Sequence, residues 1–114
     1  MKRLKIFFGI ICISLFGCQT TTYSYKRHIS EEAGIKSTNS LISTSITFIN
    51  KSERTVNIFW IDYQGKRKFY LRLPSGQIHN QPTFLTHPWL ITDDNDNALW
   101  LYYPDAQART IEIK

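Results

Sequence analysis

From residue 44 onward, turn-forming residues divide the chain into short runs that are rich in β-branched and aromatic side chains. Such runs are typical of strands, and none of them has a helical period long enough for an ordinary helix. The expected strands cover residues 44–50, 55–63, 66–73, 88–92, 98–103 and 108–113. Residues 77–84 are a seventh candidate, which Pro82 restricts to a sheet edge or an irregular strand. The pattern predicts an all-β fold, either an antiparallel β-sandwich or a small barrel.

The clearest alternation is in the sequence KFYLRL. Phe69, Leu71 and Leu73 share one parity, and a strand places residues of one parity on the same face. We therefore expect these three side chains to face the core and Tyr70 to point outward. The turn before this run contains Gly65, which predicts a hairpin with a positive φ at the glycine.

The first eighteen residues have the composition of a bacterial export signal. A cationic start, MKRLK, is followed by a short apolar run and then by LFGC, which ends at Cys18. The apolar run is shorter than the roughly 20 residues of a membrane-spanning helix. LFGC resembles the lipobox of bacterial lipoproteins, in which the cysteine becomes the lipidated N-terminus after cleavage.

This resemblance predicts a lipoprotein with three parts. They are a signal peptide at 1–17, a lipidated Cys18 with a tether at 18–43, and a domain at 44–114. The alternatives are an uncleaved N-terminal anchor and an ordinary secreted protein. Residues 19–39 are polar and have no sustained period, and the short helix that Ser30 could cap would end at Gly34.

The signal changes both the cysteine count and the charge. Cys12 lies in the signal and Cys18 carries the lipid, so the mature domain has no thiol for a disulfide or a cysteine-based zinc site. The full chain has 14 basic and 9 acidic residues, a net charge of +5. Without Lys2, Arg3 and Lys5, 11 basic residues against 9 acidic ones leave +2. A surplus this small on an exported chain argues against a nucleic-acid partner.

The expected location is the cell envelope, where the lipid holds the protein on a membrane. Gln19 follows the cysteine. An aspartate at that position favours retention in the inner membrane of enteric-type bacteria. The outer membrane is therefore the favoured location, with the domain on its periplasmic or surface face.

Between residues 60 and 89 the sequence holds aromatic and hydrogen-bonding side chains that suit a small binding pocket. They are Trp60, Tyr70, Thr83, His87 and Trp89. If Phe59 and Leu90 lie in the core, alternation turns Trp60, His87 and Trp89 outward, and grouped exposed aromatics indicate a binding surface. The alternative is structural, because Trp and His also fill the cores of small sandwiches.

The order of motifs across residues 46–91 is specific. Asn50-Lys51-Ser52 is followed by Trp60, a glycine turn, Tyr70, Leu73-Pro74 with Gly76, Thr83-Phe84, and His87-Pro88-Trp89-Leu90. This order resembles the β domain of the von Hippel–Lindau tumour suppressor family. The resemblance implies a seven-stranded antiparallel β-sandwich, and residues 101–104 and 110–113 match the family's last two strands.

In that family the domain holds a hydroxyproline of the hypoxia-inducible factor α chain. The resemblance places the five pocket residues on Trp60, Tyr70, Thr83, His87 and Trp89, with threonine in place of a serine. It implies recognition of a proline or hydroxyproline side chain in an extended peptide or protein segment. Aromatic walls would pack on the ring, while a hydroxyl and an imidazole would bond to the 4-hydroxyl.

Two departures from the family limit what the resemblance implies. Pro82 stands where the family pocket has a further histidine. The family's helical domain, which binds elongin C, has no counterpart before the chain ends at Lys114. Recruitment of a ubiquitin ligase is therefore not implied.

The predicted function is non-catalytic binding by a membrane-anchored module. The rival interpretations are a structural envelope lipoprotein, whose sandwich docks into a larger assembly, and a hydrolase. The sequence suggests no carboxylate to orient the pair of Thr83 and His87. His28, His79 and His87 lack metal-ligand spacing, so neither an enzyme nor a metal or other cofactor is expected.

Two charged stretches have alternative interpretations. DDNDN at 93–97 is typical of a turn, and it lacks the glycine and terminal glutamate of an EF-hand calcium loop. Lys66, Arg67, Lys68 and Arg72 indicate a solvated face or a protected sheet edge. They could also lie against anionic lipid headgroups.

Overall fold

The structure, a computed structural model, describes residues 22–114 of the chain. The expected signal peptide at 1–17 and the expected lipid site at Cys18 lie outside the described residues. The elements are α1 (Ile29–Glu32), β1 (Ser43–Asn50), β2 (Val56–Ile61), β3 (Arg67–Leu73), β4 (Ile78–Phe84), β5 (Trp89–Thr92), β6 (Ala98–Tyr102) and β7 (Arg109–Ile113). Within residues 22–114, no helix has the length and apolar character needed to cross a bilayer.

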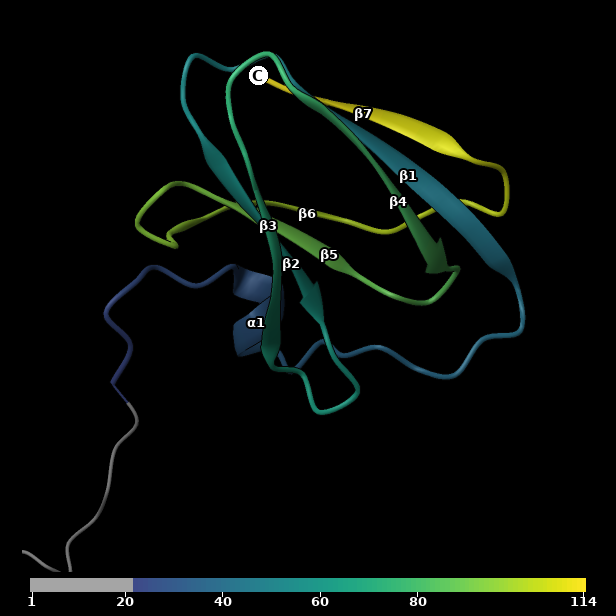
Figure 1. Cartoon of the computed structure of the whole chain (residues 1–114). Coiled ribbons are helices and arrows are strands. Elements are labelled where there is room, and N and C mark those ends of the chain that lie inside the picture. Colours follow the sequence, from purple (N-terminus) through teal and green to yellow (C-terminus); the bar gives the residue numbers. More distant parts are fainter. Residues whose placement is uncertain (1–21) are drawn as a thin grey trace, which may run out of the picture.

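The strands of residues 22–114 form two facing sheets (Figure 1). One sheet has the order β4-β1-β7, and the other has the order β3-β2-β5-β6. The predicted seven-stranded β-sandwich is therefore confirmed. β1 and β7 pair in parallel, however, whereas the sequence predicts antiparallel pairing. The chain leaves edge strand β6 of one sheet for edge strand β7 of the other, and this crossing brings β7 beside β1 in the same direction.

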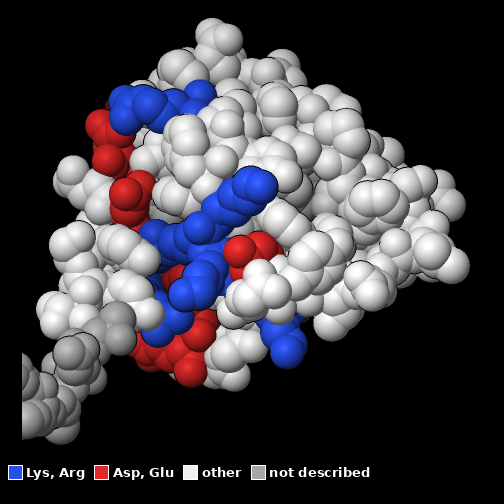
Figure 2. Space-filling view, turned by 60° about the horizontal axis from the view of Figure 1, so that its bottom comes forward, with Lys and Arg blue, Asp and Glu red and all other residues white. Residues whose placement is uncertain are grey.

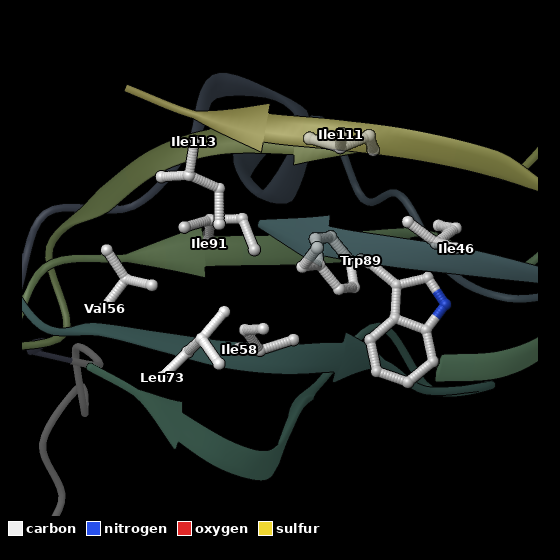
Figure 3. Packing of buried hydrophobic residues seen from close by; sticks show 9 residues of the cluster. Ile46, Val56, Ile58, Leu73, Trp89, Ile91, Ile111 and Ile113 are labelled. Carbon is white, nitrogen blue, oxygen red and sulfur yellow. The ribbon is translucent and has the colours of Figure 1, made fainter. Parts of the chain in front are cut away.

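The inner faces of the two sheets meet in a core of aliphatic and aromatic side chains (Figure 3). Its buried members are at most 4% exposed: Ile46, Phe48, Val56, Ile58, Leu73, Trp89, Ile91, Ile111 and Ile113. Trp89 lies at one end of this group, beside Ile46. Burial of each such side chain stabilises the fold by about 1.5–3 kcal/mol relative to exposure, so packing between the sheets is the main source of stability.

A second cluster lies on the outer face of the four-stranded sheet. Phe59, Ile61 and Leu90 are buried there, with Ile35 of the preceding segment packed against them. β2 and β5 are thus buried on both faces, which explains their nearly continuous apolar sequences. Phe59 and Leu90 are core residues as predicted. They belong to the cluster on the outer face of the sheet, so the side chains of opposite parity point inward. The prediction that Trp60, His87 and Trp89 face solvent is therefore wrong.

Arg67 attaches the N-terminal segment to this sheet. Its Nε and Nη2 donate to the two carboxylate oxygens of Glu31 at 2.8 and 2.9 Å, and Nη1 donates to the Asp96 carbonyl at 2.7 Å. The guanidinium also lies over the Tyr25 ring, 4.0 Å from its centroid. Burial alone would raise the pKa of Glu31, but hydrogen bonds from Arg67 and from the His28 backbone hold it below its usual value.

Part of the segment assigned to a tether is therefore packed on the domain. The N-cap of α1 is His28 rather than the expected Ser30, because the imidazole accepts from the Ser30 N–H and the Glu31 carboxylate accepts from the His28 N–H. The helix ends before Gly34, as expected, and Gly34 has a left-handed conformation with φ +87°. Ser37 is buried, and its hydroxyl donates to a β2 carbonyl at 2.6 Å.

The basic residues of β3 do not form one cationic face. Arg67 is buried against Glu31, and Arg72 pairs with Asp94. Figure 2 shows basic and acidic side chains next to one another on this part of the surface, with a broad uncharged area beside them. The prediction of a solvated basic strand is therefore wrong for Arg67.

The loop at 93–97 is a turn held by its own hydrogen bonds. The Asp93 carboxylate accepts from the N–H groups of Asn95 and Asn97, each at 2.9 Å, and Asp96 accepts from the Asn57 amide at 2.9 Å. Burial would raise the pKa of Asp93, but the bonds from Asn97 and Asn95 hold it below its usual value. Within the described part of the chain, no three His, Cys, Asp or Glu side chains gather as a metal site.

Candidate functional site

A pocket of about 260 Å³ opens at one end of the sandwich, between the two sheets. It lies where β1 and β5 begin and where β2 and β4 end, with β3 at one side. Its lining residues are Ser43, Thr44, Trp60, Tyr70, Pro82, Thr83, Phe84, His87 and Trp89. The structure thus brings all five predicted site residues together. Their role in binding a ligand stays a prediction.

Tyr70 reaches this pocket because β3 contains a β-bulge. Opposite two successive residues of β2, β3 presents Leu71 and then Phe69, so that Tyr70 is one residue extra. A bulge interrupts the alternation of side chains between the two faces. Tyr70 can therefore turn toward the inner side, where its ring meets the Trp89 ring edge-on with centroids 4.7 Å apart.

The bulge changes the predicted orientation of two side chains. The prediction of a core position is right for Leu73, which is 3% exposed, and for Leu71, which packs against the core. It is wrong for Phe69, which is 54% exposed and packs on Phe59 of the outer face with ring centroids 5.6 Å apart. Tyr70 does not point away from the sandwich interior but stands at the mouth of the pocket.

Trp89 and Thr83 form a hydrogen-bonded pair in the pocket wall. The indole Nε1 donates to Thr83 Oγ1 at 2.8 Å, and the two residues are 2% and 6% exposed. Because Trp89 pairs in register with Trp60, both indoles project from the inner face of the sheet. The bond joins β4 of one sheet to β5 of the other, and it occupies the Thr83 oxygen as an acceptor.

His87 is enclosed by aromatic rings. The centroids of the Trp60, Tyr63 and Phe84 rings lie 5.3, 5.4 and 5.4 Å from that of the imidazole. The Tyr63 hydroxyl lies 3.3 Å from Nε2. Burial lowers the pKa of His87, and a hydrogen bond to the Thr38 carbonyl partly opposes this effect. The imidazole is therefore neutral at pH 7.

Tyr63 and Phe84 also surround His87, although the sequence pattern did not indicate them as functional candidates. Phe84 is the last residue of β4 and directly follows Thr83. Its position next to a predicted site residue was a signal in the sequence that it lies near the pocket. Tyr63 lies in the turn after β2, and its ring meets the Trp60 ring edge-on at 5.3 Å. It shares the parity of Phe59, so alternation alone places it on the wrong face.

The wall of the pocket is uncharged and largely aromatic. Among residues 22–114, no carboxylate lines the pocket, and none of the lining side chains carries a charge when His87 is neutral. Trp60 Nε1 and Thr44 Oγ1 have no hydrogen-bond partner among residues 22–114, but both atoms are shielded within the wall. The arrangement suits the binding of a neutral ring better than acid–base catalysis.

Comparison with known protein families adds an independent observation. A family model described as the VHL beta domain matches residues 35–105. The matched range covers more than half of the chain and contains all nine residues that line the pocket. It begins at Ile35, the residue that packs against the outer cluster of the four-stranded sheet.

Proposed function

Because this chain belongs to the VHL beta domain family, a substrate-recognition fold, we propose that it binds an extended peptide or protein segment without catalysing a reaction. The observation that supports this proposal is the pocket itself. Residues from both sheets converge on it, and they are aromatic or hydrogen-bonding rather than charged. Its volume of about 260 Å³ is below the range of pockets for drug-sized molecules, so one side chain of a larger ligand is the appropriate guest.

The proposed guest is a proline-type ring, either proline or hydroxyproline. Trp60, Tyr70 and Trp89 supply flat surfaces on which a pyrrolidine ring packs. Proline-containing segments are recognised in aromatic-lined grooves because their extended conformation is already formed before binding. β3 and β4, which flank the pocket, are edge strands of their sheets. An extended segment could therefore pair with one edge while the ring enters the pocket.

Truncation of Tyr70 tests this proposal. The full chain would be titrated by calorimetry with a proline-containing peptide and with the same peptide carrying alanine. Tyr70→Ala should weaken binding of the proline peptide about fivefold or more, because an aromatic anchor at a binding site contributes more than about 1 kcal/mol. Tyr103→Ala is the matched control, since Tyr103 and Tyr70 are 43% and 41% exposed and only Tyr70 lines the pocket.

Two outcomes would contradict the proposal. In one, folded wild-type protein binds none of a panel of proline-containing peptides. In the other, Tyr103→Ala weakens binding as much as Tyr70→Ala does. A surface away from the pocket would then be the one that matters, as expected for a structural protein of a larger assembly.

The proposal includes attachment to a membrane of the cell envelope through a lipid on Cys18. Its support is the sequence alone, since residues 1–18 lie outside the described part of the chain. The outer membrane is the proposed location because Gln19 follows the cysteine. Cells expressing the chain should incorporate labelled palmitate into it. Cys18→Ser should abolish the label, and Cys12→Ser should leave it, whereas equal labelling of both variants would refute the assignment.

A further inference from the structure

We infer that the pocket prefers a ring that stands next to an acidic residue in its ligand, and that Lys68 recognises the acidic side chain. The inference rests on the proposed function and goes further, because it names the charge of the segment that is bound. It assigns a specificity-determining role to a residue outside the pocket wall.

Lys68 points toward the pocket side of the four-stranded sheet. Its two neighbours in β3 point the other way, because the Arg67 guanidinium and the Phe69 ring lie 5.4 and 5.6 Å from the centroid of the Phe59 ring. Phe59 belongs to the cluster on the outer face. Side chains of a regular strand alternate, and the bulge comes only after Phe69, so Lys68 faces inward. It stands directly opposite Trp60, whose side chain is part of the pocket wall.

Lys68 is the one basic residue of β3 that has no acidic partner among residues 22–114. Arg67 pairs with Glu31, and Arg72 pairs with Asp94. Within this part of the chain, no carboxylate lies at ion-pair distance from Lys68. The residue is exposed, so its ammonium is hydrated and can pair with a charge that a ligand brings.

The rim that the three-stranded sheet contributes is apolar instead. Leu41 and Ile42 are 101% and 48% exposed, and they directly precede Ser43, which lines the pocket. Phe84, another lining residue, is 41% exposed. An acidic group of the ligand therefore finds its counter-charge on the β3 side of the pocket, at Lys68.

A ligand residue next to the ring in sequence comes within reach of Lys68. Consecutive Cα atoms are about 3.8 Å apart, and directly opposed residues of two antiparallel strands are about 4.5–5.5 Å apart. The flexible stem of a lysine spans a similar distance. The acidic residue that Lys68 recognises is therefore the one directly before or directly after the ring.

Three peptides of one sequence test this inference. The proline has Gln on both sides, Glu before it, or Glu after it. Each peptide is titrated into the full chain by calorimetry at about 0.01 M salt, where the Debye length is roughly 30 Å. At least one Glu peptide should bind the wild-type protein about twofold to fivefold more tightly than the Gln peptide, as expected for an exposed ion pair. This gain should disappear at about 1 M salt.

Two substitutions assign the gain to Lys68. Lys68→Gln should abolish it, and Lys68→Glu should replace it by a preference for Lys at the same peptide position. Lys26→Gln is the matched control, because it removes the same charge from another exposed residue, whose carbonyl accepts from the Ala98 N–H at 2.8 Å beside the outer cluster. The control should keep the wild-type preference. Urea unfolding checks that each variant is folded.

Three outcomes would overturn the inference while leaving the proposed function intact. They are equal affinity of the wild-type protein for the peptides, a gain that survives in Lys68→Gln, and a gain that Lys26→Gln abolishes as well. With equal affinities, Lys68 would serve only to protect β3, an edge strand, from pairing with another chain. If folded protein binds none of the peptides, the proposed function itself fails.

Discussion

Replacing Glu31 by Gln should destabilise the fold by about 3 kcal/mol. The side chains of Arg67 and Glu31 are only 7% and 2% exposed, and they share two hydrogen bonds of 2.8 and 2.9 Å. Removing one partner of a buried ion pair costs about 3–5 kcal/mol, because the remaining charge stays buried without its counter-charge. Arg67 would keep its bond to the Asp96 carbonyl and its place over the Tyr25 ring, which puts the expectation at the lower end.

The assay is urea unfolding of the full chain at pH 7, followed by tryptophan fluorescence. The matched control is Glu112→Gln, which breaks two exposed pairs, one with Lys51 and one with Lys114. Glu112 and Lys51 lie 3.4 Å apart, and their side chains are 43% and 54% exposed. Solvent screens such a pair, so its loss should cost less than about 1 kcal/mol. The two variants make the same chemical change and differ in burial.

The pH dependence of stability provides a second readout of the same pair. The pKa of Glu31 is lower in the folded protein than its ordinary value of 4.5. The stabilisation is therefore fully present above about pH 4.5, and it is lost as the pH falls through the lowered folded value. Glu31→Gln should lack this part of the acid destabilisation. A loss below about 1 kcal/mol at pH 7, or an unchanged acid profile, would refute the reasoning.

Three further predictions concern backbone geometry and buried hydrogen bonds, and each is measured by urea unfolding. Gly65→Ala should lower the free energy of unfolding more than Gly76→Ala does. Both glycines have positive φ, but only at Gly65 would the new Cβ meet a carbonyl, that of Ile35, at 3.0 Å. Equal losses of about 1 kcal/mol would show that this contact relaxes freely. Thr83→Val should cost about 1–3 kcal/mol, since the Trp89 indole would lose its acceptor, and a change within about 0.5 kcal/mol would contradict the bond. Asn50→Asp should cost about 3 kcal/mol or more, because it turns a carboxylate toward two carbonyls that the amide now reaches at 2.8 Å; wild-type stability at pH 7 would disprove that role.

The strands could be predicted because local signals agree with the tertiary structure along most of the domain. Gly65 and Gly76 both adopt the positive φ that a turn glycine permits. Pro82 lies in β4, which is an edge strand as its missing N–H requires. Alternation identifies the inner residues of β1, where Ile46 and Phe48 are fully buried. For these elements, short-range sequence rules were sufficient.

The features that could not be predicted depend on contacts between distant residues. Alternation does not reveal which face of a strand is inner when both faces are covered, as they are at Phe59 and Trp89. The segment around Ile35 covers the outer face of the four-stranded sheet. The polar composition of residues 19–39 gives no sign of this packing and is typical of a tether. Arg67 is buried by a partner 36 residues away, and no local pattern marks that pairing.

The bulge in β3 makes the pocket depend on the length of one strand. Deleting one residue beside Tyr70 would restore regular alternation in β3, and no residue there would be spare to turn toward Trp89. Leu71 and Leu73 would keep their pairing with β2, so the sandwich could still fold. Loss of a single codon would therefore remove the Tyr70 wall of the pocket while preserving the scaffold. Among related genes, an insertion or deletion at this position would separate chains that keep the pocket from chains that keep only the fold.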